Sequence, residues 1–92
     1  MNYFAVLYTY ATDKAKLDEV RPEHRRYLSS LAENVGAGPL LGTDPSRALL
    51  LFRADSLEAV TQLLDADPFH AAGLITNREV FGWNPATGSL AQ

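Results

Sequence analysis

The stretch YFAVLYTY, residues 3–10, constrains the fold most, because it is apolar on both faces of an extended chain. Its aromatic and β-branched residues predict a β-strand. Alternate side chains of a strand point to opposite faces, and both sets are apolar here. Residues 48–54, ALLLFRA, share this property. Two such strands need cover on both sides, so they belong at the centre of a sheet rather than at its edge.

The other segments give an element order. In chain order, we predict a strand over 3–10, a helix over 13–35, an irregular edge strand over 36–42, a strand over 48–54, a helix starting after Ser56, a short helical turn between Asp67 and Gly73, and a strand over 74–83. This βαββαβ order predicts an α+β, ferredoxin-like fold, in which an antiparallel four-stranded sheet carries two main helices on one face. Residues 1–84 would form the single domain, and residues 85–92 a polar tail.

The uncovered face of this sheet predicts self-association. In the ferredoxin-like arrangement the first and third strands are central, and the helices cover only one face. The other face would exceed the roughly 300–600 Å² of apolar patch that monomers tolerate. We therefore expect a homodimer whose sheets pack face to face.

Composition excludes several classes of function. The chain has 92 residues, no cysteine and a net charge of −3, and its basic residues are scattered. Nucleic acid is therefore not an expected partner, and neither is a cysteine-based metal site. No apolar run approaches the roughly 20 residues that span a bilayer, and the first ten residues lack the basic start of a signal peptide. We expect a cytoplasmic protein with no membrane partner and, since no cofactor fingerprint occurs, no cofactor.

The segment VRPEHRRYL places a histidine on the buried side of the first helix. His24 falls at helical spacing from Leu17 and Leu28, so it lies on the apolar stripe. A core histidine satisfied by its neighbours would show the same pattern. Pro22 predicts a break at Arg21 and a fresh helix start, which would place His24 in the first turn. The positive end of a helix and burial both disfavour an imidazolium there, leaving the neutral ring that a general base requires.

The segment DADPFHAAG supplies a carboxylate partner. Asp67 precedes Pro68, which predicts an N-cap followed by proline in the first helical position. One carboxylate oxygen can cap the helix while the other orients His24. Asp65 is a competitor two residues earlier. A metal site built from His24, Asp67 and His70 can be drawn, but we predict none.

RPEHRRYL together with DADPFHAAGL resembles the YCII-related (YciI-like) family over about residues 3–83. The resemblance implies a ferredoxin-like fold, assembly into dimeric α/β barrels, and a His–Asp active site, which the motifs place at His24 and Asp67. It also suggests lyase-like or isomerase-like chemistry.

Two functions remain open at this point. One is a cofactor-independent enzyme that acts on a small molecule, with His24 and Asp67 as a general acid/base pair in a pocket between helices and sheet. The other is a non-catalytic module that binds a small metabolite in the same pocket. The predicted ligand-binding residues, aromatic or backbone-exposing, are Tyr8, Tyr27, Phe69, Gly38 and Pro39.

Overall fold

The two strands that are apolar on both faces lie side by side at the centre of one sheet. The computed structural model describes residues 2–91. Its elements are β1 (Asn2–Tyr10), α1 (Lys14–Ser29), β2 (Asn34–Leu40), β3 (Arg47–Ala54), α2 (Leu57–Asp65), α3 (Pro68–Ala71) and β4 (Ile75–Trp83). The strand order is β2-β3-β1-β4, and every neighbouring pair is antiparallel.

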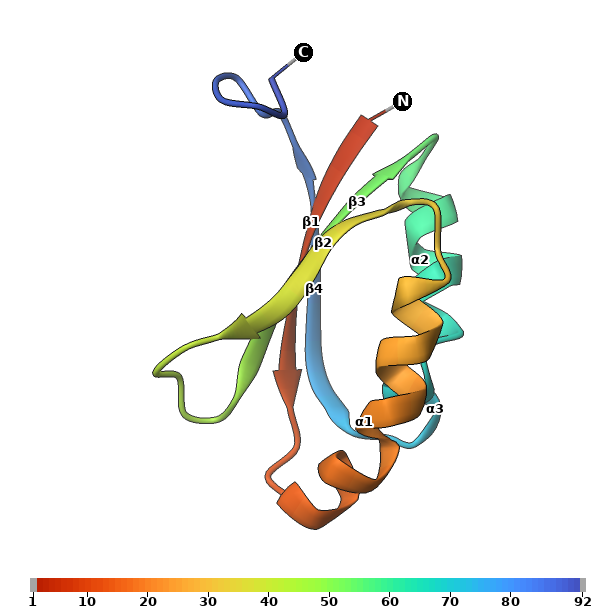
Figure 1. The fold of residues 1–92 in the computed structure, drawn as a ribbon, viewed down its shortest axis with the longest axis vertical. Coiled ribbons are helices and arrows are strands. Elements are labelled where there is room, and N and C mark those ends of the chain that lie inside the picture. Colours follow the sequence, from red (N-terminus) through yellow and green to blue (C-terminus); the bar gives the residue numbers. More distant parts are fainter. Residues whose placement is uncertain (1, 92) are drawn as a thin grey trace.

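The helices all lie on one side of this sheet (Figure 1). The predicted α+β, ferredoxin-like fold is therefore confirmed. Residues 84–91 follow β4 without helix or strand. Met1 and Gln92, the outermost residues of the predicted domain and tail, lie outside the described residues. Among residues 2–91, no helix is long and apolar enough to cross a membrane.

The core fills the space between the helices and the inner face of the sheet. Val6, Tyr8 and Phe52 are fully buried on β1 and β3, and Val60 and Leu64 of α2 pack against them. Ser56 caps α2 as predicted, because its side chain accepts a hydrogen bond from the Ala59 amide. Helix-facing residues of the two central strands thus tie both main helices to the sheet.

The first helix is shorter than predicted. It ends at Ser29 instead of residue 35. The Asn34 side chain donates to the Leu28 carbonyl at 3.1 Å and so satisfies a backbone acceptor that the helix end leaves open. Leu31 still packs against the core, from the loop, whereas Val35 is exposed on β2. Leu31 and Val35 therefore follow the helical spacing by coincidence, although both lie beyond the end of the helix.

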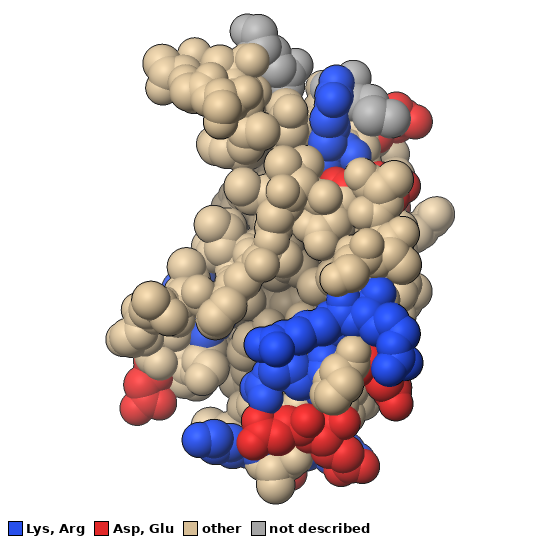
Figure 2. Space-filling model, in the orientation of Figure 1, with Lys and Arg blue, Asp and Glu red and all other residues tan. Residues whose placement is uncertain are grey.

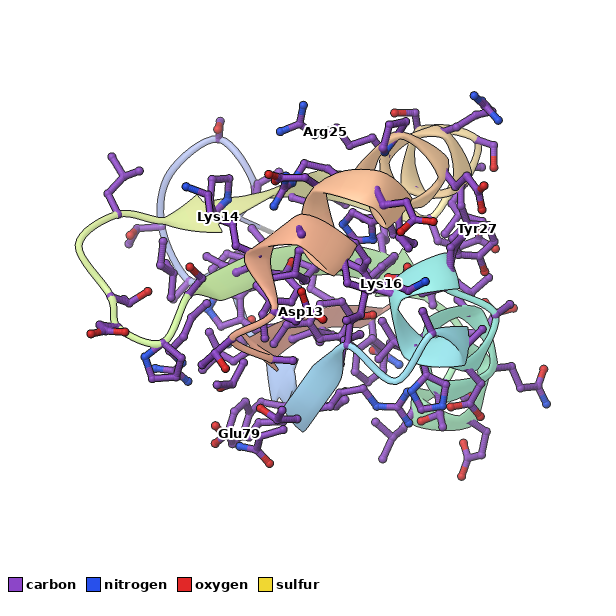
Figure 3. All side chains as sticks on the ribbon, turned by 90° about the horizontal axis from the view of Figure 1, so that it is seen from below. Asp13, Lys14, Lys16, Arg25, Tyr27 and Glu79 are labelled. Atoms are coloured by element: carbon purple, nitrogen blue, oxygen red, sulfur yellow. The ribbon has the colours of Figure 1, made fainter. Side chains whose placement is uncertain are left out.

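Pro22 kinks α1 but does not interrupt it. The helix runs unbroken from Lys14 to Ser29 with Pro22 inside. In Figure 3 its first turns cross the view, while its later turns are seen nearly end-on. A proline inside a helix costs about 3 kcal/mol. Burial of Leu17 before the kink and of Leu28 after it offsets that cost, because both ends of the helix are packed.

The prediction that His24 lies in the first turn of a fresh helix is therefore wrong. Asp13, not a residue beside Pro22, is the N-cap of α1, and its side chain accepts from the Lys16 amide. His24 lies well beyond the first turn, so the positive end of the helix dipole does not act on it. Of the two features predicted for His24, a helix start and burial, only burial is present, since 8% of the residue is exposed.

The outer face of the sheet carries no helix and is apolar at its centre. Strand register places alternate residues of the central strands there, and Phe81 and Trp83 of β4 extend this surface with 49% and 39% of their area exposed. The other apolar members are Tyr3, Ala5, Leu7, Leu49 and Leu51. The uncovered apolar face that the sequence predicted is thus present.

Candidate active site

His24 and Asp67 meet in the interior between α1 and α3. The His24 Nδ1 atom lies 2.8 Å from Oδ1 and 3.0 Å from Oδ2 of Asp67. Asp67 is completely buried, and the His24 side chain is 10% exposed. The structure thus brings together the two residues that the motifs singled out, from positions 43 residues apart in the chain.

Asp67 is held by its own helix. It is the N-cap of α3, where its Oδ1 accepts a hydrogen bond from the Phe69 amide at 2.9 Å. Pro68 follows at the start of the helix, and Gly73 closes it in the left-handed conformation with φ +71°. Capping and contact with His24 are therefore compatible, as predicted, and the short helix fixes the orientation of the carboxylate.

Tyr8 supplies a third hydrogen bond to the same carboxylate. Its hydroxyl donates to Asp67 Oδ2 at 3.0 Å in the fully buried core. Burial, followed by the charge of Asp67, raises the pKa of Tyr8 above its ordinary value. The phenol therefore keeps its proton at neutral pH and acts only as a donor to Asp67.

These contacts favour one tautomer of His24. Asp67 receives a backbone N–H and a phenol O–H, the pattern of an ionised carboxylate that accepts hydrogen bonds. The His24 Nδ1 atom facing it then carries a proton and donates. With Nδ1 so occupied, the free lone pair lies on Nε2, on the ring edge turned away from Asp67.

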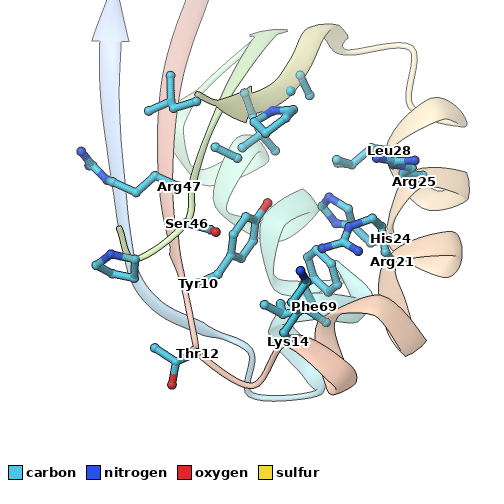
Figure 4. Close-up of a pocket in the computed structure, with 18 of the residues that line it drawn as sticks. Tyr10, Thr12, Lys14, Arg21, His24, Arg25, Leu28, Ser46, Arg47 and Phe69 are labelled. Atoms are coloured by element: carbon cyan, nitrogen blue, oxygen red, sulfur yellow. The ribbon is translucent and has the colours of Figure 1, made fainter. Parts of the chain in front are cut away.

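A cavity of about 630 Å³ opens beside His24, between α1 and the β2–β3 side of the sheet. The His24 ring stacks on Phe69, with ring centres 4.0 Å apart and planes 17° apart, and both residues line the cavity. Figure 4 shows Tyr10 opposite them, with its hydroxyl directed into the space. The apolar remainder of the wall is Leu17, Leu28, Ala37, Pro39, Leu40, Pro45, Ala48 and Leu50.

The predicted ligand-binding residues divide into two groups. Phe69, Gly38 and Pro39 line the cavity. Tyr8 lies behind the cavity and contacts Asp67 instead. Tyr27 points to the other side of α1 (Figure 3), where its hydroxyl donates to the Leu63 carbonyl at 2.7 Å, so its observed contacts are structural.

The competing acid and the second histidine lie at a separate place. Asp65 is exposed and pairs with Arg78 at 2.9 Å, and the His70 Nε2 atom lies 3.8 Å from the same carboxylate. His70 therefore does not join His24 and Asp67. Within residues 2–91, no group of three or more His, Asp or Glu is arranged to hold a metal ion.

Sequence reasoning missed Tyr10 and the basic residues of the cavity. Tyr10 continues the alternation of Tyr8 at the end of β1, a signal that could have placed it on the helix side. Burial raises the pKa of Tyr10 to about 12, with a smaller contribution from Asp67, so its hydroxyl stays protonated. Lys14, Arg21 and Arg25 line the α1 wall and are at helical spacing from one another.

The chain resembles known proteins in sequence and in fold. Residues 1–84 match the model of the YCII-related domain. A solved structure with a TM-score of 0.80 and 24% identity is that of 5-chloro-2-hydroxyhydroquinone dehydrochlorinase from Burkholderia phenoliruptrix in complex with 2,5-dihydroxybenzoquinone; the match covers 98% of this chain and 99% of that chain. Comparison with curated protein sequences gives no match.

Two further solved structures are more distant. SnoaB, a cofactor-independent oxygenase from Streptomyces nogalater, gives a TM-score of 0.56 at 17% identity over 98% of this chain and 96% of that chain. A protein of Mesorhizobium loti described as a dabb family protein with a ferredoxin-like fold gives 0.52 at 13% identity over 96% and 100%. These likenesses agree with the observed fold. The match over residues 1–84 shows that the chain belongs to the YCII-related domain family.

Proposed function

We propose that this protein is a cofactor-independent enzyme that moves a proton on a small organic molecule. The observation that carries the proposal is the buried His24–Asp67 pair, whose histidine lines a 630 Å³ cavity. Asp67 occupies Nδ1, so Nε2 is the atom that remains to exchange a proton with a ligand. A cavity of this volume holds a molecule of one or two rings.

The proposed step is proton abstraction from carbon. The Nε2 lone pair of His24 forms an N–H bond while a substrate C–H bond breaks, and the C–H electron pair enters an adjacent unsaturated system. In an elimination, a leaving group on the neighbouring carbon then departs with its electron pair. In an isomerisation, the imidazolium returns the proton to a different carbon. Asp67 stabilises the imidazolium between these steps.

The relatives support this class of chemistry. A 5-chloro-2-hydroxyhydroquinone dehydrochlorinase and a cofactor-independent oxygenase share the fold. The hydrogen-bonded pair gives this chain a group of its own for proton transfer. A module that only binds a metabolite would not require the buried carboxylate on Nδ1.

Turnover of a panel of lactones and halogenated hydroxyaromatics by the purified protein tests the proposal. His24→Gln should abolish turnover and keep most of the ligand binding. His70→Gln is the matched control, because His70 is the other of the two histidines and lies outside the cavity. If ligands bind without turnover across the panel, the protein is a binding module and the proposed enzyme function fails. Equal activity in both variants would contradict the role of His24.

We further propose that two chains associate through the outer faces of their sheets. The support is the apolar surface built around Leu7, Leu49 and Leu51 and extended by the exposed rings of Phe81 and Trp83. Surfaces of this kind are uncommon on monomers. The cavity lies on the helix side of the sheet, so this association would leave it open.

A further inference from the structure

The cavity has a positively charged wall that the proton-transfer pair does not explain. Lys14, Arg21 and Arg25 line it from α1. Figure 2 shows basic side chains gathered over α1, and Figure 4 shows the three residues on the wall that carries His24. The chain as a whole has a net charge of −3, so this concentration of cations is local and not a consequence of a basic protein.

These cations are only partly neutralised. Arg21 pairs with Asp18 on the surface of α1. Within residues 2–91, neither Lys14 nor Arg25 has a carboxylate within ion-pair distance. Arg47 also borders the cavity, but its guanidinium pairs with Glu79 at 3.4 Å, and strand register places both on the outer face. Asp44, in the loop after β2, is the one acid among the lining residues of the described chain.

The rest of the lining indicates the body of a ligand. The His24 and Phe69 rings stack on each other and both line the cavity, and Tyr10 packs edge-on against Phe69 with ring centres 5.3 Å apart. The Tyr10 hydroxyl keeps its proton up to high pH because burial raises its pKa to about 12, so it can donate to an oxygen anion. Flat apolar surfaces beside cationic groups and an O–H donor match an unsaturated ring with an acid group.

We propose that the cavity takes a planar ring carboxylate, with its acid group bound by Lys14, Arg21 and Arg25 and its ring placed against His24 and Phe69. For catalysis, this inference rests on the proposed function: the same cations would stabilise the negative charge that develops when Nε2 removes a proton. For binding, the inference stands on the lining alone.

Binding of matched acids and amides tests the assignment. Benzoate and salicylate are titrated against benzamide and salicylamide, which have the same rings without the charge, and the His24 ring signals are followed by NMR. The acids should bind about tenfold more tightly than the amides at low salt. This preference should shrink as salt is raised, because Lys14 and Arg25 are exposed to solvent.

Two pairs of variants show which residues cause the preference for acids over amides. Arg25→Gln and Lys14→Gln should each reduce the acid preference about threefold to fivefold. Arg26→Gln and Lys16→Gln should leave it unchanged, because these neighbours on the same helix do not line the cavity. Lys14 and Arg25 are both exposed, so we expect both variants to keep the fold.

The assignment is overturned if the amides bind as tightly as the acids, if the control variants lose as much preference as the lining variants, or if neither acid binds in the millimolar range. These outcomes are separate from failure of the proposed function. Acid-selective binding in a protein whose turnover is unaffected by His24→Gln would keep the ligand class and reject the catalytic role. Turnover of neutral substrates alone would keep the catalytic role of His24 and reject the carboxylate as the ligand class.

Discussion

Replacing Asp67 by alanine removes three contacts at once and gives the sharpest structural prediction. The carboxylate caps α3 through the Phe69 amide, accepts from the Tyr8 hydroxyl and holds His24 Nδ1. Loss of an N-cap costs about 1 kcal/mol. A buried hydroxyl left without an acceptor costs about 1–3 kcal/mol. The empty space and the unpartnered imidazole add to these costs, so we expect Asp67→Ala to lower the free energy of unfolding by about 3–5 kcal/mol in total.

A loss of this size is large for a domain of 92 residues. Such domains are stabilised by only about 5–15 kcal/mol. Each kcal/mol shifts the melting temperature by roughly 4–8 °C, so Asp67→Ala should melt at least about 12 °C lower. Urea denaturation followed by circular dichroism measures the free energy of unfolding directly.

Asp65→Ala is the matched control. Asp65 is exposed and paired only at the surface, so its loss should cost no more than about 1 kcal/mol. Asp67→Asn should fold, since an amide oxygen can still accept from Phe69, but its NH₂ group would force the other His24 tautomer and remove the base. The reasoning is refuted if Asp67→Ala is no less stable than Asp65→Ala.

The remaining predictions concern tyrosines, the cap of α2 and the sheet face. Tyr8→Phe should cost about 1.5 kcal/mol in urea denaturation, because Asp67 loses a charge-assisted donor; an unchanged midpoint would contradict this. Burial raises the Tyr10 pKa from 10.0 to about 12, so the stability gained from its protonated form is complete below pH 10 and falls as pH rises towards 12. Tyr10→Phe should flatten the plot of unfolding free energy against pH between pH 10 and 12. A plot identical to that of the unsubstituted protein would exclude Tyr10 as the source of the pH dependence. Ser56→Ala should lower the unfolding free energy by about 1 kcal/mol through loss of the α2 cap, and a neutral result would show that the cap contributes nothing. Sedimentation should give a dimer that Phe81→Glu converts into a folded monomer, and a monomer before substitution would reject the proposed association.

The sequence predicted the fold because its strongest signals agreed with the tertiary packing. Two strands apolar on both faces became the central pair of the sheet, and Pro39 lies on the edge strand β2, where a residue without an N–H is tolerated. The helix boundaries were harder to predict. The local effect of Pro22 predicted a break, but the buried stripe continues across it, and packing on both sides outweighed the local preference.

The site was predicted in part, for reasons that differ between residues. His24 and Asp67 were found because one lies on an apolar stripe and the other starts a capped helix, and the family motifs join the two. The link from Tyr8 to Asp67 spans 59 residues and depends on strand register, which no local pattern reveals. The basic wall was missed because Lys14 and Arg25 look like ordinary exposed residues until the kinked helix places them beside a cavity.

The tautomer of His24 tests the central claim most directly. Long-range ¹⁵N–¹H NMR distinguishes the two ring nitrogens, and the chain has only two histidines to assign. We predict a proton on Nδ1, directed at Asp67, and an unprotonated Nε2 whose signal shifts when a ligand enters the cavity. A proton on Nε2 with a bare Nδ1 at neutral pH, or a His24 signal that Asp67→Asn leaves unchanged, would contradict the proposed general base.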